Sequence, residues 1–96
     1  MQPNIIKTHR FRGKRYSIRL GARLPADRRG DADAPRIPGR MIRIRNGMDG
    51  LTMLDTLIHE GLHACSWDMA DEAVHETASD IARFLWRLGY RTDQGQ

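Results

Sequence analysis

Hydrophobic and polar positions alternate in the first half of the chain and recur with helical spacing in the second half. The alternation predicts strands over residues 5–11, 14–20 and 40–46, because successive side chains of a strand point to opposite faces. Gly13 lies in a short turn between the first two strands, which indicates a β-hairpin. Residues 21–39 are rich in proline, glycine and aspartate, and we expect a long loop there.

The helical spacing predicts one helix over residues 50–66 and a second over residues 69–88. Either Asp49 or Thr52 could cap the start of the first helix, and Asp68 is placed to cap the second. The second helix would be a rod of about 30 Å, at a rise of about 1.5 Å per residue.

Each predicted helix has one apolar stripe that would face the core. In the first helix the stripe consists of Leu51, Leu54, Ile58, Leu62 and Cys65. In the second helix it consists of Val74, Thr77, Ala78, Ile81, Leu85 and Leu88. The order of elements therefore predicts an α+β fold: residues 1–96 form one domain, with a β-rich basic part over residues 1–46. Its sheet would be small, three-stranded and mainly antiparallel, followed by two packed helices.

Composition narrows the class of protein. The chain has 96 residues, of which 40% are hydrophobic and 29% charged, as in an ordinary globular domain. Cys65 is the only cysteine, so an intramolecular disulfide is excluded and a reducing compartment is favoured. No apolar run is long enough to span a bilayer, and residues 1–4 do not resemble a signal peptide. We therefore expect a cytoplasmic protein with no membrane partner.

Charge is divided unevenly between the two halves of the chain. Residues 1–50 carry 13 Lys and Arg against 4 Asp, a net charge of +9, whereas residues 51–96 carry 3 Arg against 8 Asp and Glu, a net charge of −5. Clustered cations attract polyanions, so the first half could contact nucleic acid. Placement of the arginines on the solvent face of the sheet is the simpler interpretation, because no aromatic residues are interleaved with the charges.

The segment His59-Glu60-Gly61-Leu62-His63 is an HExxH motif within the first predicted helix. Histidines four residues apart lie on the same helix face, so both imidazoles can reach one metal ion. Glu60 lies next to them and can act as general base toward a water that the metal activates. The motif predicts a Zn²⁺ site in a hydrolase, with His59 and His63 as ligands and Glu60 as the catalytic residue.

A catalytic zinc needs a third protein ligand, and the second predicted helix offers one. The segment from Val74 to Ile81 contains Glu76 and, four residues later, Asp80. Together with the HExxH motif this spacing resembles the gluzincins, the thermolysin-type zinc metallopeptidases. The short chain is most similar to the minigluzincins or to small SprT-like proteins with a minimal zincin core. The resemblance implies that Glu76 is the third zinc ligand and that Asp80 holds a ligand histidine in its metal-binding tautomer.

Two other residues are candidates for the third zinc ligand. His75 could bind the metal with Glu76 turned outward, and Glu72 could do so if the helices close differently. The strand over residues 40–46 directly precedes the motif and would bind an extended substrate by β-augmentation if it lies at the edge of the cleft.

The sequence thus predicts a zinc-dependent metallopeptidase that hydrolyses a peptide or protein substrate. A non-catalytic zinc-binding module is one alternative, because a structural zinc is closed by four protein ligands. A nucleic-acid-associated protein that uses the basic half is the other.

Overall fold

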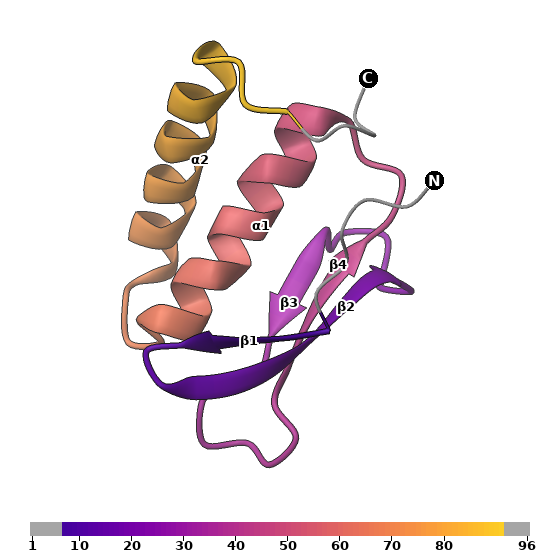
Figure 1. Cartoon of the computed structure of the whole chain (residues 1–96), viewed down its shortest axis with the longest axis vertical. Coiled ribbons are helices and arrows are strands. Elements are labelled where there is room, and N and C mark those ends of the chain that lie inside the picture. Colours follow the sequence, from indigo (N-terminus) through magenta and orange to yellow (C-terminus); the bar gives the residue numbers. More distant parts are fainter. Residues whose placement is uncertain (1–6, 92–96) are drawn as a thin grey trace.

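Four strands and two helices make up the described part of the chain, residues 7–91 of the computed structural model. In chain order the elements are β1 (Thr8–Phe11), β2 (Lys14–Ala22), β3 (Gly30–Ala32), β4 (Met41–Arg45), α1 (Gly50–Cys65) and α2 (Asp71–Arg87). Figure 1 shows the two helices side by side next to the twisted sheet. The α+β class predicted from the sequence is therefore confirmed.

The sheet has the strand order β1-β2-β4-β3 and is mixed. β1 pairs with β2 and β3 with β4 in antiparallel fashion, whereas β2 and β4 are parallel. The prediction of three mainly antiparallel strands was wrong, because β3 forms inside residues 21–39, where we expected only a loop. A strand of 3 residues is too short for alternation to reveal it, and its stability comes from pairing with β4.

The other strand predictions agree with the structure near their centres. β2 extends two residues beyond the expected end at Leu20, and β4 lies within residues 40–46. β1 begins at Thr8, and the part of the predicted first strand before Lys7 lies outside the described residues. Arg12 and Gly13 both have positive φ angles, 50° and 82°. Two consecutive positive φ angles are those of a type I′ turn, which suits the twist of a hairpin.

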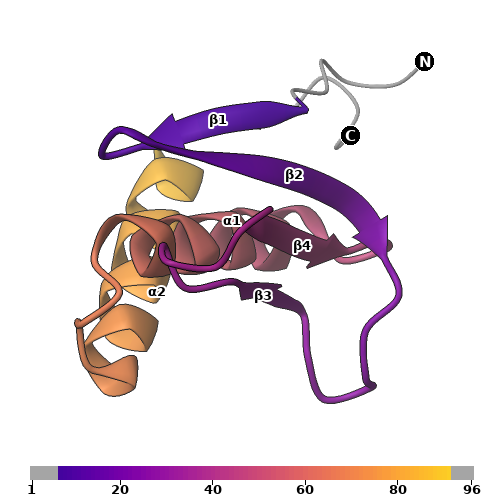
Figure 2. The ribbon, with the colours of Figure 1, turned by 90° about the horizontal axis from the view of Figure 1, so that it is seen from below.

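α1 packs on the sheet, and α2 packs on α1. α1 contacts β1, β3 and β4, whereas α2 contacts α1 and no strand among the described elements. Figure 2 gives the same arrangement from below, with α1 along the sheet and α2 beyond it. The core between α1 and the sheet is a cluster of buried residues, Tyr16, Ile42, Ile44 and Ala64. The sheet thus supports α1 directly and α2 only through α1.

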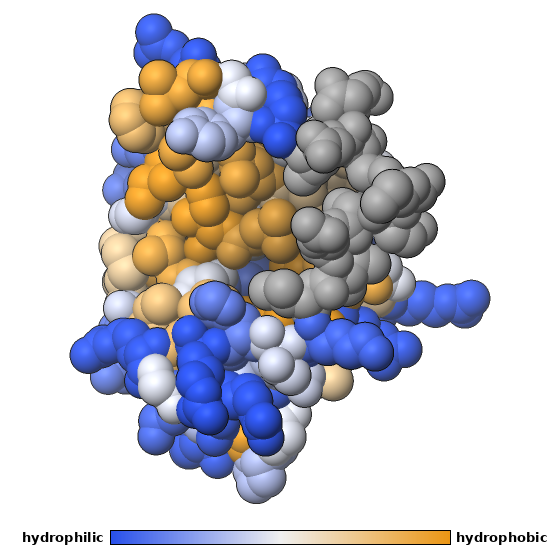
Figure 3. Space-filling model, in the orientation of Figure 1, coloured by the Kyte–Doolittle hydropathy of each residue, from blue (hydrophilic) through white to orange (hydrophobic). Residues whose placement is uncertain are grey.

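The buried faces of the helices differ from the predicted stripes. The buried residues of α1 are Thr56, Glu60 and Ala64. The predicted stripe from Leu51 to Cys65 is only half-buried, so the prediction that it forms the core face of α1 was wrong. The buried residues of α2 are Val74, Ala78 and Ala82. Large apolar side chains of both helices are left exposed, namely Leu57, Ile81, Phe84 and Leu88. Figure 3 shows the resulting hydrophobic surface over the helices.

The helix ends also test the predicted caps. The Thr52 backbone N–H donates to Asp49 Oδ1 over 2.8 Å, so Asp49 is the side-chain cap of α1. α2 begins after Ala70 with no side-chain cap, and the prediction that Asp68 caps it was wrong. Acidic residues in the first turn of α2, Asp71 and Glu72, instead lie at the positive end of the helix dipole.

Candidate active site

His59 and His63 lie one turn apart on α1, and their ring centroids are 4.9 Å apart. Both rings are half-buried. Burial lowers the pKa of His59, and the neighbouring His63 lowers it further. A depressed pKa favours the neutral imidazole, which is the form that binds a metal ion. The two predicted ligands on α1 therefore lie next to each other, and the lowered pKa of His59 favours its neutral form.

Glu60 is buried, with 5% of its surface exposed. Burial raises the pKa of its carboxyl group to about 7, and the negative charge of Asp31 adds to the effect. The side chain lies under β3, because a Cβ built on Gly30 would be 3.1 Å from Glu60 Cγ. A carboxyl group that titrates near neutrality can both accept and return a proton.

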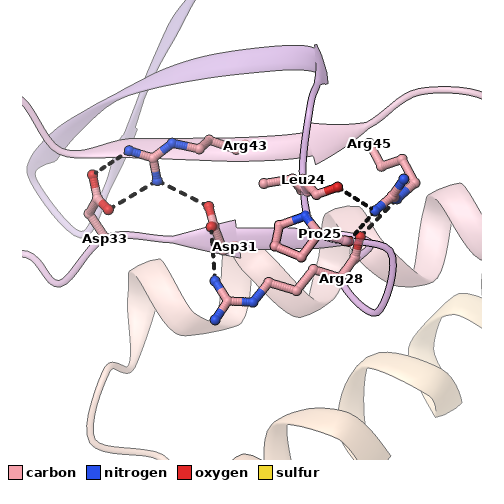
Figure 4. A network of polar contacts seen from close by, with 7 residues as sticks. All are labelled: Leu24, Pro25, Arg28, Asp31, Asp33, Arg43 and Arg45. Atoms are coloured by element: carbon pink, nitrogen blue, oxygen red, sulfur yellow. Dashed lines mark hydrogen bonds and ion pairs between the residues drawn. The ribbon is translucent and has the colours of Figure 1, made fainter.

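An ionic network fixes β3 over this carboxyl group. Arg43 on β4 donates to Asp31 Oδ1 over 3.0 Å and to both carboxylate oxygens of Asp33. Arg28 adds an ion pair with Asp31 over 3.6 Å. Figure 4 shows these contacts on one side of β3 and β4. The network holds a short strand against its only sheet partner among the described residues.

Arg45 holds the loop that precedes β3 in place. Its guanidinium group donates to the carbonyl oxygens of Leu24, Pro25 and Arg28 (Figure 4). The last strand, β4, is an interior strand that pairs with β2 on one side and with β3 on the other. Our expectation that this strand could line the cleft edge was wrong, because β3 occupies that edge.

α2 faces α1 with a definite register. Ser79 Oγ donates to Asp55 Oδ2 over 3.0 Å, and the rings of His75 and His59 have centroids 6.4 Å apart. The two contacts are four residues apart on each helix, so the helices run antiparallel with His75 level with the motif. Among the candidates for the third ligand, His75 is thus the residue whose side chain meets the motif.

The remaining predicted site residues lie at an open depression on α2. The residues that line it are His75, Glu76, Ser79, Asp80 and Arg83. Glu72, His75 and Glu76 are all exposed, and Asp80 is ion-paired with Arg83 over 2.8 Å. Within residues 7–91, no three His, Cys, Asp or Glu side chains converge in a geometry that would hold a metal ion. A metal site at the two motif histidines would require a side chain of α2 to move toward them.

Two features of the site were missed by sequence reasoning. One is the position of Gly30 and Asp31, which lie within the predicted loop and approach Glu60 only because β3 forms. The other is Asp55, whose Oδ1 atom is buried without a hydrogen-bond partner among the described residues. Asp55 precedes His59 by one helical turn, a spacing that could have identified it as a neighbour of that histidine.

No family model matches the chain, and no curated protein or solved structure is significantly similar to it. In residues 7–91, neither helix is long and apolar enough to cross a bilayer.

Proposed function

We propose that this protein is a zinc-dependent metallopeptidase whose centre is the HExxH motif of α1. The observation that carries the proposal is the occurrence on one helix of a buried carboxyl group, Glu60, whose pKa is raised to about 7, and of two imidazoles, His59 and His63, whose ring centroids are 4.9 Å apart. Perturbed carboxyl groups next to potential metal ligands are typical of hydrolytic sites.

His59, His63 and His75 would hold the metal ion. Support for His75 comes from its ring contact with His59 and from the register of the two helices. Glu76, which the gluzincin resemblance favours, follows on the next position of α2 and is the alternative ligand. A rotation of α2 about its own axis would exchange these two residues, since adjacent helix positions differ by about 100°.

Asp55 is the better candidate for orienting a ligand histidine. One of its carboxylate oxygens accepts a hydrogen bond from Ser79, and the other is buried with no hydrogen-bond partner within residues 7–91. His59 lies one turn along the same helix, and the charge of Asp55 acts on its pKa. A carboxylate that accepts a ring N–H fixes the tautomer that binds the metal. Asp80, to which the resemblance gives this role, is exposed and ion-paired with Arg83.

The reaction would use Glu60 as the proton carrier. A zinc ion supplies Lewis-acid chemistry at such a site, acidifying water and polarising a carbonyl group. Glu60 takes a proton from the attacking water and delivers it to the leaving amine, and a pKa near 7 suits both transfers. The buried surroundings of Glu60 keep this proton exchange away from bulk solvent.

An extended peptide is the substrate that the sheet favours. β3 is an edge strand that pairs on one side with β4, and its Gly30 lies against Glu60. A peptide that adds to the side of β3 left unpaired by the described strands would gain main-chain hydrogen bonds and place a carbonyl group near the motif.

A hydrolysis assay with Glu60→Gln tests the proposal. Zinc-loaded wild type should cleave a denatured, fluorogenic casein, and Glu60→Gln should bind zinc yet lose activity by roughly 100-fold or more, because the proton carrier is removed. Asp68→Asn, which alters an exposed carboxylate, should retain activity. Equal rates for wild type and Glu60→Gln, or no cleavage by the zinc-loaded wild type, would refute the peptidase function.

A further inference from the structure

The sheet face that points away from the helices carries arginines on β1 and β2. Tyr16 and Ile18 belong to the core beneath the sheet, so the flanking residues Arg15 and Arg19 point to the opposite side. Arg10 on β1 lies directly opposite Arg15 and shares this side. All three arginines are exposed. The hairpin therefore presents a guanidinium cluster to solvent, on the face opposite the HExxH motif.

No acidic side chain of the described residues is ion-paired with this cluster. Residues 7–24 contain 7 Lys and Arg and no Asp or Glu. Within residues 7–91, none of the ion pairs includes a residue of that segment. On the same sheet, Arg43 is paired with both Asp31 and Asp33. The contrast shows that the charge is balanced on the β3–β4 half of the face and unbalanced on the β1–β2 half.

The direct pairing of Arg10 with Arg15 has an energetic consequence. Like charges at opposite positions of an antiparallel pair are destabilising, and a bound anion would relieve the repulsion. The neighbouring cross-strand pair on the same face is Thr8 with Ser17, whose hydroxyl groups can donate to phosphate oxygens. The face thus combines unbalanced positive charge with neutral donors.

We propose that this face, defined by Thr8, Arg10, Arg15, Ser17 and Arg19, binds the phosphate backbone of nucleic acid. Guanidinium groups match phosphate geometry with paired hydrogen bonds. The five residues include no apolar side chain, so the face lacks the insertion element of a membrane surface and the apolar centre of a protein interface. A two-stranded ribbon also fits the major groove of duplex DNA. Binding through the backbone would be independent of base sequence.

The salt dependence of DNA binding tests the proposal. The full chain is titrated into a fluorescent duplex of random sequence, and anisotropy is recorded over a series of salt concentrations. Neutralisation of three phosphates by the three arginines predicts a slope of log K against log salt of about −2.7. Glu60→Gln should give the same slope, because the motif lies on the other side of the sheet.

Matched variants assign the binding to the hairpin. Arg10→Gln with Arg15→Gln should reduce the slope to about −0.9 and weaken binding at least roughly tenfold at low salt. Arg36→Gln with Arg87→Gln removes the same charge from exposed positions elsewhere and should change affinity less than about threefold. Arg10→Lys with Arg15→Lys retains the charge and should retain most of the slope. Circular dichroism confirms that each variant is folded.

Three results would overturn the proposal. The first is absence of duplex binding by the wild type at low salt. The second is equal weakening in the hairpin variant and in its charge-matched control, which would reduce the effect to net charge. The third is hairpin-dependent binding to vesicles of phosphatidylcholine and phosphatidylserine without binding to the duplex, which would assign the face to membranes.

Discussion

At the scale of single residues, the environment of Glu60 determines what the site can do. Its carboxyl group lies in the layer between α1 and β3, where Thr56 and Ala64 are its buried neighbours on the helix. Charge is disfavoured there, so the pKa rises to about 7 from 4.5. The same burial that prepares a proton carrier also makes the folded state sensitive to pH.

Stability of the metal-free protein should therefore depend on Glu60 between pH 4.5 and 8. The folded pKa exceeds the unfolded value, so the folded state retains a proton that the unfolded state has lost in this interval. The contribution is present at low pH and is lost as pH rises through about 7. Relative to Glu60→Gln, the wild type should lose about 3 kcal/mol of unfolding free energy from pH 4.5 to 8. Urea unfolding in the presence of a chelator measures this, and a difference that stays constant with pH would contradict the assignment.

A second prediction separates the two carboxylates that could orient a ligand. Asp55→Asn should lower zinc affinity by roughly 10- to 100-fold, because a buried partner of His59 is altered. Asp80→Asn removes an exposed carboxylate from its pair with Arg83 and should leave the affinity within about twofold. Chelator competition measures both. Weakening by Asp80→Asn but not by Asp55→Asn would restore the role that the gluzincin resemblance gives to Asp80.

Sequence reasoning at this scale identified the motif but not its surroundings. The spacing of His59 and His63 is a local property of a helix, so their adjacency followed from the sequence alone. The choice between His75 and Glu76 depends on how α2 is rotated against α1. That rotation is set by tertiary packing, in this case by small buried residues such as Ala78 and the bond from Ser79 to Asp55.

At the scale of elements, β3 connects the loop to the site. Its pairing partner lies about a dozen residues along the chain, and Arg43 on β4 holds it through Asp31 and Asp33. The composition of residues 21–39 indicates a loop, and most of that segment is one. A strand that depends on non-local pairing and ion pairs leaves little periodic signal in the sequence.

Gly30→Ala should disturb this strand. A Cβ at Gly30 would lie 3.0 Å from the Arg43 backbone oxygen and 3.0 Å from Thr56 Cγ2, so β3 would be pushed from its neighbours. We expect a loss of about 1–3 kcal/mol in unfolding free energy, together with weaker peptide cleavage. Gly61→Ala is the matched control, because its Cβ would meet Phe11 at an ordinary 3.6 Å and alanine favours the helix. Chemical denaturation measures the unfolding free energy of both variants. A value for Gly30→Ala equal to or above that of the wild type would argue against the close packing.

At the scale of the whole molecule, the layers explain why a metal ion would matter to the fold. In the described part of the chain α2 contacts α1 but no strand, and large apolar side chains of both helices are exposed. A chain of this size buries a modest share of its surface, so a ligand that bridges the helices adds appreciably to stability. The layer order could be expected from the sequence, whereas the inward face of α1 could not, because its buried residues Thr56 and Glu60 are polar.

Zinc affinity measured by competition with a chelator tests the central claim most directly. Wild type and Glu60→Gln should each bind one equivalent, and at about 100 times its Kd zinc should raise the unfolding free energy by about 2.7 kcal/mol. His63→Ala and His75→Ala should each lose roughly 100-fold or more in affinity, whereas Glu76→Ala should not. No binding by the wild type, or full affinity without His63, would contradict the metal site itself. Weakening by Glu76→Ala with His75→Ala unaffected would contradict the assignment of His75.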